Sequence, residues 1–421
     1  MLIEMSVANF RSLRDQQTFS LMKSAGDELE STNTFSTTAA KRFDLLRSAA
    51  IYGPNASGKS NFLDALQTMK KIVQQSANQY KRGDRIPVVP FRLDSKNRHM
   101  PSEFEVSCIV DGVRYQYGFS ATAERIHDEW LYAYPKGRAQ RWFIRAWDEE
   151  KKQHAWDLGH NLSGEKQLWQ KSTRDNALFL STAIQLNSEQ LKPLFDWFDQ
   201  SLHFANVSGW NPAFTASLCE HDHKARIMQF MKAADLNIDD IVVEREVFDS
   251  KALPEDMPEH LRDIISKDLE GKKFLRITTI HKDSDGNDVV FDLEDESDGT
   301  QKLFSFAGPW LDALENGYVL FIDELHDNLH PQLVQFLVQL FHSSKTNPKN
   351  AQLVFTTHET SILNQSVFRR DQVWFCEKSE SLSSKLFSLL DFSPRKGREN
   401  IEQAYLSGRY GAIPFLRDIG E

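Results

Sequence analysis

The sequence predicts an α/β fold with a mixed β-sheet, interrupted by an antiparallel β lobe and a mostly helical insertion. Three observations predict this fold. A glycine-rich loop stands between an apolar strand and an amphipathic helix, two more apolar strands end in polar residues near the C-terminus, and apolar and polar residues alternate in the stretch after the first helix. We expect four segments: residues 1–80, the β lobe 81–160, the helical insertion 161–270, and residues 271–421, which complete the sheet of the first segment.

The composition is typical of a soluble globular protein. Of 421 residues, 40% are hydrophobic and 26% are charged, and no apolar run approaches the roughly 20 residues of a membrane span. The N-terminus lacks the basic region of a signal peptide, and the three cysteines are scattered, so we expect a cytoplasmic protein without disulfides. The net charge of -10 gives no global attraction to nucleic acid but does not exclude a local basic patch.

The chain opens with a predicted strand and a short turn. Residues 2–7 alternate apolar and polar side chains, and the turn with the sequence N-F-R-S follows at residues 9–12. Residues 22–45 are polar and contain many serines and threonines, so we expect a loop before the next strand.

The glycine-rich loop fits the phosphate-binding pattern G-x-x-x-x-G-K-[ST] at every fixed position. A short apolar strand precedes it at residues 47–52, and residues 61–73 after it have helical periodicity. In this context the loop N–H groups and the helix N-terminus form a site for phosphates. Lys59 would reach the β- and γ-phosphates of ATP, and the Ser60 hydroxyl would bind Mg²⁺. The loop consists of Gly53, Pro54, Asn55, Ala56, Ser57, Gly58, Lys59 and Ser60.

Residues 87–158 have an apolar period of two, which predicts the antiparallel lobe. Two such runs flank Asp111-Gly112, a pair typical of a type I′ hairpin turn, and two aromatic strands follow near Trp130 and Trp142. The basic residues of the lobe favour a solvated strand face over a contact with nucleic acid. They are Lys136, Arg138, Arg141 and Arg145.

Residues 160–245 have mostly helical periodicity, clearest at residues 191–198 and 224–234. No heptad pattern continues over several repeats, so we expect no long coiled coil.

A second candidate site element lies in the C-terminal third. Residues 318–322 are apolar, and Asp323 and Glu324 follow them. Because a strand inside a parallel sheet is buried on both faces, acids at its carboxyl end project into the crevice where ligands bind. Asp323 would hold Mg²⁺, and Glu324 would position and polarise the attacking water. The next apolar strand, residues 352–357, ends at His358, which we expect to sense the γ-phosphate and help close the site.

These motifs, in this order, resemble those of the ABC-class ATPases. Between the loop and the acid pair, Ser297 and Gly299 resemble a divergent form of the signature element of that class, although glutamate at 296 and aspartate at 298 depart from it. The resemblance implies an ATP hydrolase that works as a head-to-tail dimer. ATP would lie between Lys59 and Ser60 of one copy and Ser297 and Gly299 of the other.

Further site residues are implied by the same resemblance. The N-F-R-S turn ahead of the phosphate loop resembles the ATPase heads of the RecF, SMC and OLD class. It implies nucleotide-binding roles for Arg11, in that turn, and for Asn61, directly after the loop. Gln185 would take the place of the glutamine that binds the metal in ABC-class sites.

The whole chain resembles the bacterial AAA15/AAA21 ATPases. This resemblance is carried by N-F-R-S, by D-G-T-Q-K at residues 298–302, by L-H-P at 329–331, and by Y-L-S-G-R-Y-G-A-I-P at 405–414. It is greatest to the RloA/AbiL-type proteins and the ATPase of the PARIS system, which act in anti-phage defence.

The resemblance implies an ATP-dependent sensor that controls a co-encoded effector, such as an RloB-like or TOPRIM-like nuclease. The stretch after His358 is too short for a TOPRIM domain, so we expect the nuclease to be a separate protein. The alternative is a repair ATPase of RecF type that clamps duplex DNA.

Overall fold

The computed structural model of this chain describes residues 1–37, 39, 43–206, 209–220, 223–247, 257–269, 271 and 273–414. The chain forms two compact units. The first comprises Met1–Val207, Ala313–Asp327 and Val334–Glu421, and the second comprises Ser208–Asp312 and Asn328–Leu333. Among the helices that the structure describes, none combines the length and the apolar character needed to span a bilayer.

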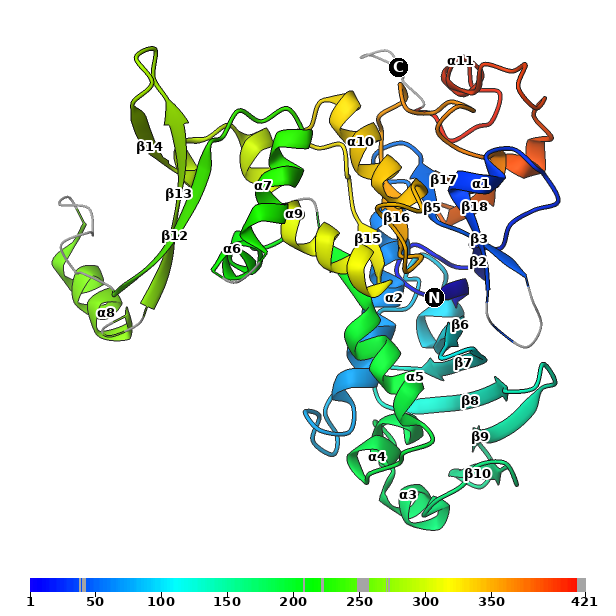
Figure 1. The fold of residues 1–421 in the computed structure, drawn as a ribbon. Helices are drawn as coiled ribbons and strands as arrows, with labels where there is room; N and C mark the ends of the chain where they lie inside the picture. Colours follow the sequence, from blue (N-terminus) through cyan, green and yellow to red (C-terminus); the bar gives the residue numbers. More distant parts are fainter. Residues whose placement is uncertain are drawn as a thin grey trace, which may run out of the picture. The chain divides into compact units, whose positions relative to one another are not determined.

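The first unit contains a six-stranded sheet in the order β11-β15-β16-β5-β17-β18 (Figure 1). The strands from β11 to β17 are parallel, and β18 is antiparallel to β17. All residues of β5, β15 and β16 are buried, as expected for strands covered on both faces. The mixed sheet confirms the predicted α/β class. Its strands are β5 (Ser48–Tyr52), β11 (Leu202–Ala205), β15 (Val319–Ile322), β16 (Gln352–Thr356), β17 (Val373–Lys378) and β18 (Ser384–Ser388).

A seven-stranded antiparallel sheet is the other large sheet of this unit. Its order, β10-β9-β8-β7-β6-β1-β2, shows that the lobe strands extend the N-terminal hairpin and do not form a separate sheet. The turn at Asp111-Gly112 has φ values of 49° and 76°, the positive values that a type I′ turn requires. The strands are β1 (Leu2–Ala8), β2 (Gln17–Ser20), β6 (Ser102–Val110), β7 (Val113–Ala121), β8 (Ile126–Tyr134), β9 (Gln140–Asp148) and β10 (Gln153–Leu158).

Helix α2 (Lys59–Gln75) begins within the phosphate loop and contributes to a core shared with both sheets. Its buried face includes Phe62, Leu66, Met69 and Val73, as the periodicity predicts. Gln352 joins the two sheets, because its side chain accepts a hydrogen bond from the Leu2 N–H at 2.7 Å and donates one to the Leu2 carbonyl at 3.0 Å. The position of the loop therefore depends on both sheets.

Shorter helices complete the first unit. They are α1 (Glu30–Asn33), α3 (Lys166–Ser172), α4 (Phe179–Gln185), α5 (Lys192–Asp196) with a π-helical turn at Trp197–Ser201, and α11 (Ile401–Leu406). Short 3-10 turns lie at Asn97–His99, Arg370–Gln372 and Leu389–Phe392. Helices α9 (Asp298–Asn316) and α10 (Pro331–His342) begin in the second unit and end in the first.

The second unit combines helices with a small antiparallel sheet in the order β12-β13-β14. The insertion that we expected to be mostly helical also supplies β11 and β12. Strand β12 pairs along its length with β13, which follows much later in the chain, so local periodicity did not indicate it. The elements are α6 (Pro212–Cys219), α7 (Lys224–Ala233), β12 (Asp240–Val247), α8 (Glu259–Leu269), β13 (Lys273–Lys282), β14 (Asp288–Asp292) and a 3-10 turn at Leu293–Asp295.

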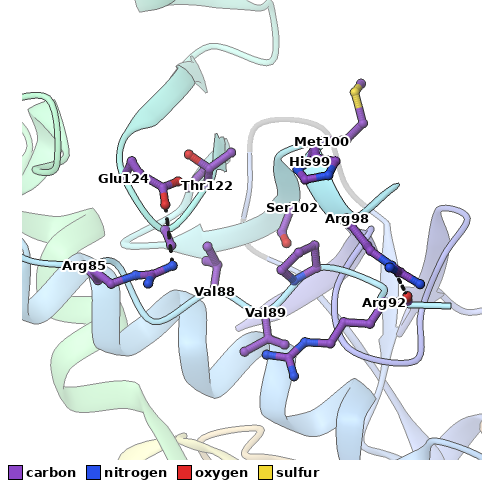
Figure 2. A pocket seen from close by; sticks show the side chains of 13 residues that line it. Arg85, Val88, Val89, Arg92, Arg98, His99, Met100, Ser102, Thr122 and Glu124 are labelled. Atoms are coloured by element: carbon purple, nitrogen blue, oxygen red, sulfur yellow. Dashed lines mark hydrogen bonds and ion pairs between the residues drawn. The ribbon is translucent and has the colours of Figure 1, made fainter. Parts of the chain in front are cut away.

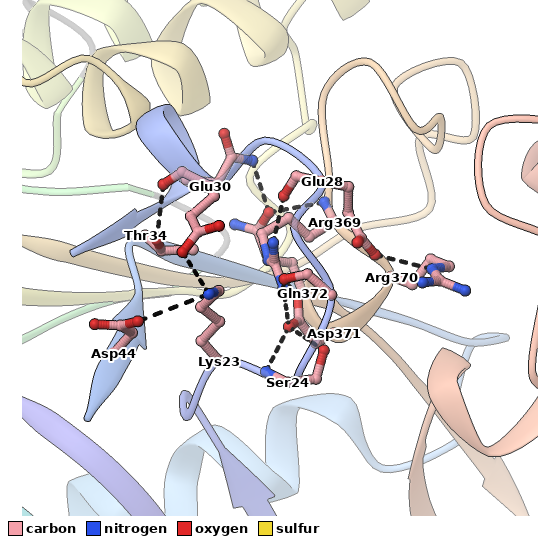
Figure 3. Close-up of polar contacts among 12 residues, drawn as sticks. Lys23, Ser24, Glu28, Glu30, Thr34, Asp44, Arg369, Arg370, Asp371 and Gln372 are labelled. Atoms are coloured by element: carbon pink, nitrogen blue, oxygen red, sulfur yellow. Dashed lines mark hydrogen bonds and ion pairs between the residues drawn. The ribbon is translucent and has the colours of Figure 1, made fainter. Parts of the chain in front are cut away.

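Residues 22–45 contain more structure than the predicted loop. They form α1, the strands β3 (Thr34–Ser36) and β4 (Asp44–Leu46), and a segment bound to the 3-10 turn at 370–372. There the buried Arg369 makes a two-pronged ion pair with Asp371, at 2.9 and 2.7 Å, and also donates to the Gly26 carbonyl (Figure 3). Asp371 accepts two hydrogen bonds from Ser24. These long-range partners order a segment whose composition alone suggests a loop.

Arg145 does not lie on a solvated face, so the prediction was wrong for one of the four basic residues of the lobe. Its side chain is fully buried, 3.7 Å from the equally buried Glu129 carboxylate, and it donates to the Ala177 carbonyl at 2.7 Å. Glu129 in turn accepts hydrogen bonds from the N–H groups of Phe179 and Leu180. The buried pair therefore links the start of α4 to the antiparallel sheet. The other three basic residues of the lobe are exposed.

We expect Glu129→Ala to lower the free energy of unfolding by about 3 kcal/mol, because it leaves the Arg145 charge buried without its partner. Urea denaturation followed by far-UV circular dichroism measures the change. The matched control is Glu124→Ala, which removes an exposed carboxylate from the neighbouring turn. Equal unfolding midpoints for the two variants would contradict a stabilising role for the buried pair.

Candidate functional site

The carboxyl ends of three neighbouring parallel strands bring the main site residues together. In the register, Ile51 of β5 lies beside Thr356 of β16, and Phe355 of β16 lies beside Ile322 of β15. The residues that follow these strands therefore share one edge of the sheet. They are the phosphate loop after β5, His358 after β16, and Asp323 with Glu324 after β15.

The phosphate loop requires glycine at two positions. Gly53 has φ 155°, and a Cβ atom there would lie 2.1 Å from the Cys376 carbonyl oxygen. Gly58 has φ 110°, and a Cβ atom there would lie 2.0 Å from Ser384 Oγ. Both contacts come from the β17–β18 hairpin, so the hairpin holds the loop closely. Between these glycines, Pro54 is half-buried, Asn55 and Ala56 are exposed, and Ser57 is buried.

Lys59 is buried and bonded to the loop itself. Its Nζ donates to the carbonyls of Gly53 and Pro54 at 2.8 and 3.1 Å and lies 3.2 Å from His358 Nε2. Burial lowers the pKa of Lys59, while the carboxylates of Asp323 and Glu324 act in the opposite direction. The ammonium is thus held at the centre of the loop by weak acceptors that a phosphate can replace.

Thr356 orients the acid pair. Its hydroxyl donates to Asp323 Oδ1 at 2.6 Å and accepts a hydrogen bond from the Glu324 N–H at 2.8 Å. Glu324 has φ 52°, a left-handed conformation unusual for glutamate. These constraints place the Glu324 carboxylate 3.7 Å from His358 Nε2.

His358 is neutral at physiological pH. Burial, together with the positive charge of Lys59, lowers its pKa to about 4. Because an ammonium group can only donate, the Nε2 atom that faces Lys59 is the acceptor, and the ring proton lies on Nδ1. The histidine therefore joins the phosphate loop to the acid pair through contacts with both.

The start of α2 and the N-terminal turn form the side of the site. Ser60 is exposed at the first turn of the helix, and Asn61 donates to Ser12 Oγ at 2.8 Å. Arg11 forms an ion pair with Asp64 of the same helix. A cavity of about 450 Å³ lies against Arg11, Ser12 and Asn61. The turn at residues 9–12 thus adds a polar wall beside the loop.

The structure does not bring Gln185 to this edge. Gln185 is the exposed last residue of α4, and Ser181 of that helix donates to the Val73 carbonyl near the far end of α2. At 1.5 Å per residue, Val73 is about 21 Å along α2 from Lys59, and the four residues from Ser181 to Gln185 span only about 6 Å. We therefore remove Gln185 from the candidate metal ligands.

Asn206 is the residue that the sequence interpretation missed. It directly follows β11, whose Ala205 lies beside Ile322, and the Asp323 N–H donates to the Ala205 carbonyl at 3.0 Å. Asn206 therefore follows β11 at the same end of the sheet as Asp323, on the outer side of β15. We predicted a helical insertion here, so this short strand was not identified. Its run L-H-F-A, in which one polar residue stands among apolar ones before an amide residue, is the signal that could have indicated it.

Ser297 and Gly299 lie in the second unit, at the start of α9. Ser297 Oγ accepts a hydrogen bond from the Thr300 N–H at 3.2 Å and lies 2.9 Å from the Thr300 hydroxyl, so it caps the helix. A Cβ atom on Gly299 would lie 3.0 Å from the Asn328 carbonyl oxygen. Ser297 is exposed, which leaves this end of a 19-residue helix accessible.

A glycine loop at a helix N-terminus, a buried lysine within it and a carboxylate pair on a neighbouring parallel strand define a P-loop nucleotide-binding domain. Residues 48–364 match the family described as "AAA domain, putative AbiEii toxin, Type IV TA system". The chain belongs to this AAA family, and it is accordingly an ATP-binding protein of the P-loop ATPase class.

Three solved structures are similar to this chain at low sequence identity. The SMC head domain from Thermotoga maritima is 11% identical with a TM-score of 0.39 and covers 92% of this chain and 98% of its own. An SMC head bound to the C-winged helix domain of ScpA is 14% identical, with a TM-score of 0.36 and coverages of 92% and 97%. The protein cbiO1 from Clostridium perfringens, part of the ABC transporter complex cbiONQ, is 10% identical, with a TM-score of 0.32 and coverages of 96% and 96%. No curated protein sequence matches the chain.

Proposed function

We propose that this chain hydrolyses ATP as the head of a head-to-tail dimer and that its nucleotide state controls a separate effector in anti-phage defence. The observation that carries the proposal is the meeting of Lys59, Glu324 and His358 at one edge of the sheet. This arrangement provides a phosphate-binding cation and a carboxylate positioned beside it. The exposed start of α9, with its capping Ser297, supports a contact with the phosphates of a second copy.

The site residues form two groups, those that bind the phosphates and the metal ion and those that act in hydrolysis. The loop N–H groups and Lys59 bind the phosphates. His358 releases Lys59 and donates a ring N–H to the γ-phosphate, which requires the ring to turn or its proton to move from Nδ1 to Nε2. Ser60, Asp323 and Asn206 offer hydroxyl, carboxylate and amide oxygens, which fit Mg²⁺. When bound, Mg²⁺ neutralises charge on the phosphates. Glu324 orients the attacking water and accepts its proton.

The family description supports the proposed effector role. The description of the matched family names a toxin of a toxin–antitoxin system, and this supports an ATPase that restrains or releases a partner protein such as an RloB-like or TOPRIM-like nuclease. A dimer that closes on two ATP molecules and opens on hydrolysis would provide two states for that partner to distinguish.

A subunit-mixing experiment tests the shared site. Lys59→Ala and Ser297→Arg are each expected to abolish ATPase activity. After the two proteins are mixed and allowed to exchange subunits, half of the dimers each regain one of two sites, so about one quarter of the wild-type activity returns. Retention of full activity by Ser297→Arg, or no recovery in a mixture shown to exchange, would refute the shared site.

A second experiment tests whether the partner is the effector protein or DNA. Affinity purification of the Glu324→Gln protein with its co-encoded neighbours, with and without ATP, is expected to retain one neighbour in a nucleotide-dependent way. Binding of labelled duplex DNA is measured in parallel over a range of salt concentrations. ATP-dependent, salt-sensitive DNA binding without a protein partner would favour the repair ATPase instead.

We expect Asn206→Ala to raise the Mg²⁺ concentration needed for half-maximal ATPase activity about tenfold, because an oxygen ligand is lost. Gln185→Ala is the matched control and is expected to behave like the wild type, since α4 lies at the other end of α2. Titration of Mg²⁺ at saturating ATP measures both. A larger effect of Gln185→Ala than of Asn206→Ala would reverse this assignment.

A further inference from the structure

A second cavity, of about 620 Å³, lies between residues 85–102 and the turn from β7 to β8. Its volume is in the range of pockets that hold a nucleotide-sized ligand. Figure 2 shows Arg85 and Glu124 at one side, Arg98 at the other, and Val88 and Ser102 between them.

Asn9 holds in place the segment that forms one wall of this pocket. Asn9 is buried in a left-handed conformation, and its amide nitrogen donates to the carbonyls of Asn97 and Met100, both at 2.9 Å. Its amide oxygen accepts a hydrogen bond from the Phe91 N–H at 3.1 Å, and the Ser102 hydroxyl donates to its carbonyl at 2.6 Å. The segment from 91 to 102 is therefore a structured wall around a single buried amide.

The pocket carries positive charge in a protein of net charge -10. Arg85, Arg92 and Arg98 line it, and Arg85 lies 3.5 Å from Glu124. Within the described part of the chain, Arg92 and Arg98 form no ion pair with a carboxylate, and Arg98 donates instead to the Arg92 carbonyl. Two guanidinium groups are thus available to an anionic ligand.

The rest of the lining is apolar or carries hydroxyl groups. Val88, Val89, Pro90 and Met100 provide an apolar surface, and Thr122 lies beside Glu124. Guanidinium groups bind phosphate oxygens in pairs of hydrogen bonds, and an apolar surface accommodates the flat face of a base. The lining therefore suits a ligand with a phosphate at one end and a flat, less polar group at the other.

We propose that this pocket binds a phosphate-bearing ligand of the nucleotide class, as a free nucleotide or as part of a single-stranded nucleic acid. The pocket adjoins the ATP site but does not include the phosphate loop. It shares Val89, Pro90 and Arg92 with the cavity beside Arg11, but none of its lining residues belongs to the phosphate loop. A Lys59→Ala variant therefore removes the contribution of the phosphate loop without changing a lining residue of this pocket.

Fluorescence anisotropy tests the proposal with two probes, a fluorescein-labelled thymidine dinucleotide with a 5′-phosphate and a labelled single-stranded oligothymidylate of twelve nucleotides. All measurements use a Lys59→Ala background, so that the phosphate loop does not contribute. Arg92→Ala and Arg98→Ala are each expected to weaken probe binding about tenfold or more. The controls Arg82→Ala and Lys96→Ala remove the same charge from the same segment outside the pocket, and they are expected to change binding less than twofold.

Each result either supports the proposed ligand class or contradicts it. Equal affinity for the two probes supports a free nucleotide as ligand, and a strong preference for the longer probe supports a nucleic-acid strand. Partial recovery of binding in Arg92→Lys supports a direct contact with phosphate. Failure of both probes to bind, or equal losses in the pocket and control variants, would overturn the proposal without affecting the ATPase proposal, since none of these residues lies in the phosphate loop.

Discussion

Glu324→Gln is expected to bind ATP with nearly wild-type affinity and to hydrolyse it at least about 100-fold more slowly. The amide keeps the size of the side chain and the left-handed backbone that Thr356 supports, but it cannot accept a proton from water. ATP-bound dimers should therefore accumulate. Measurement of nucleotide affinity, steady-state turnover and mass in solution with ATP tests the three parts of this prediction.

The control for this variant is Glu359→Gln. Glu359 directly follows His358, but its carboxylate accepts a hydrogen bond from the Ser361 N–H at 2.9 Å, within its own turn. We expect its turnover to stay within twofold of the wild type. Normal turnover by Glu324→Gln would mean that another group activates the water, and the proposed mechanism would be wrong.

Lys59→Ala is expected to weaken ATP binding by a factor of about 100 or more, because charge-assisted hydrogen bonds to two phosphate groups are lost. We expect the fold and its stability to be unchanged by this substitution. The buried ammonium has lost solvation, as its lowered pKa indicates, and its removal frees the carbonyls of only two loop residues. Isothermal titration calorimetry with ATP measures the loss, and thermal unfolding without nucleotide checks the fold.

Lys71→Ala is the matched control, since Lys71 is an exposed lysine of the same helix. ATP affinity should be unchanged in this variant. ATP should also raise the unfolding temperature of the wild type and of Lys71→Ala, but not of Lys59→Ala. Equal stabilisation of all three proteins by ATP would show that the nucleotide binds elsewhere.

The residues of the phosphate loop were predictable because their chemistry is local. A glycine loop between a strand and a helix requires only a few consecutive residues, and the acids after β15 and the histidine after β16 follow the same rule for strands buried on both faces. Their meeting at one edge depends on β5, β16 and β15 being neighbours, which the order of motifs suggested and the strand register shows.

Other assignments failed where distant segments meet. The short strand β11 belongs to the sheet only because it pairs with β15, more than a hundred residues later, so Asn206 was overlooked and Gln185 was chosen instead. Arg145 was placed on a solvated face because strand alternation alone does not reveal that the segment 174–177, which precedes α4, accepts its hydrogen bonds. Each error concerns burial or pairing that no local pattern records.

The amino-acid sequence by itself determined that this protein has a phosphate-binding loop, a carboxylate pair and a histidine at strand ends, because each depends on a few neighbouring residues. Only the tertiary structure decided which amide stands beside Asp323, and that the antiparallel strands continue the N-terminal hairpin. It also revealed an arginine-lined pocket arranged around Asn9. The physical reason is that strand order, burial and cavities arise from contacts between segments far apart in the chain, where side-chain packing and backbone pairing override local preference.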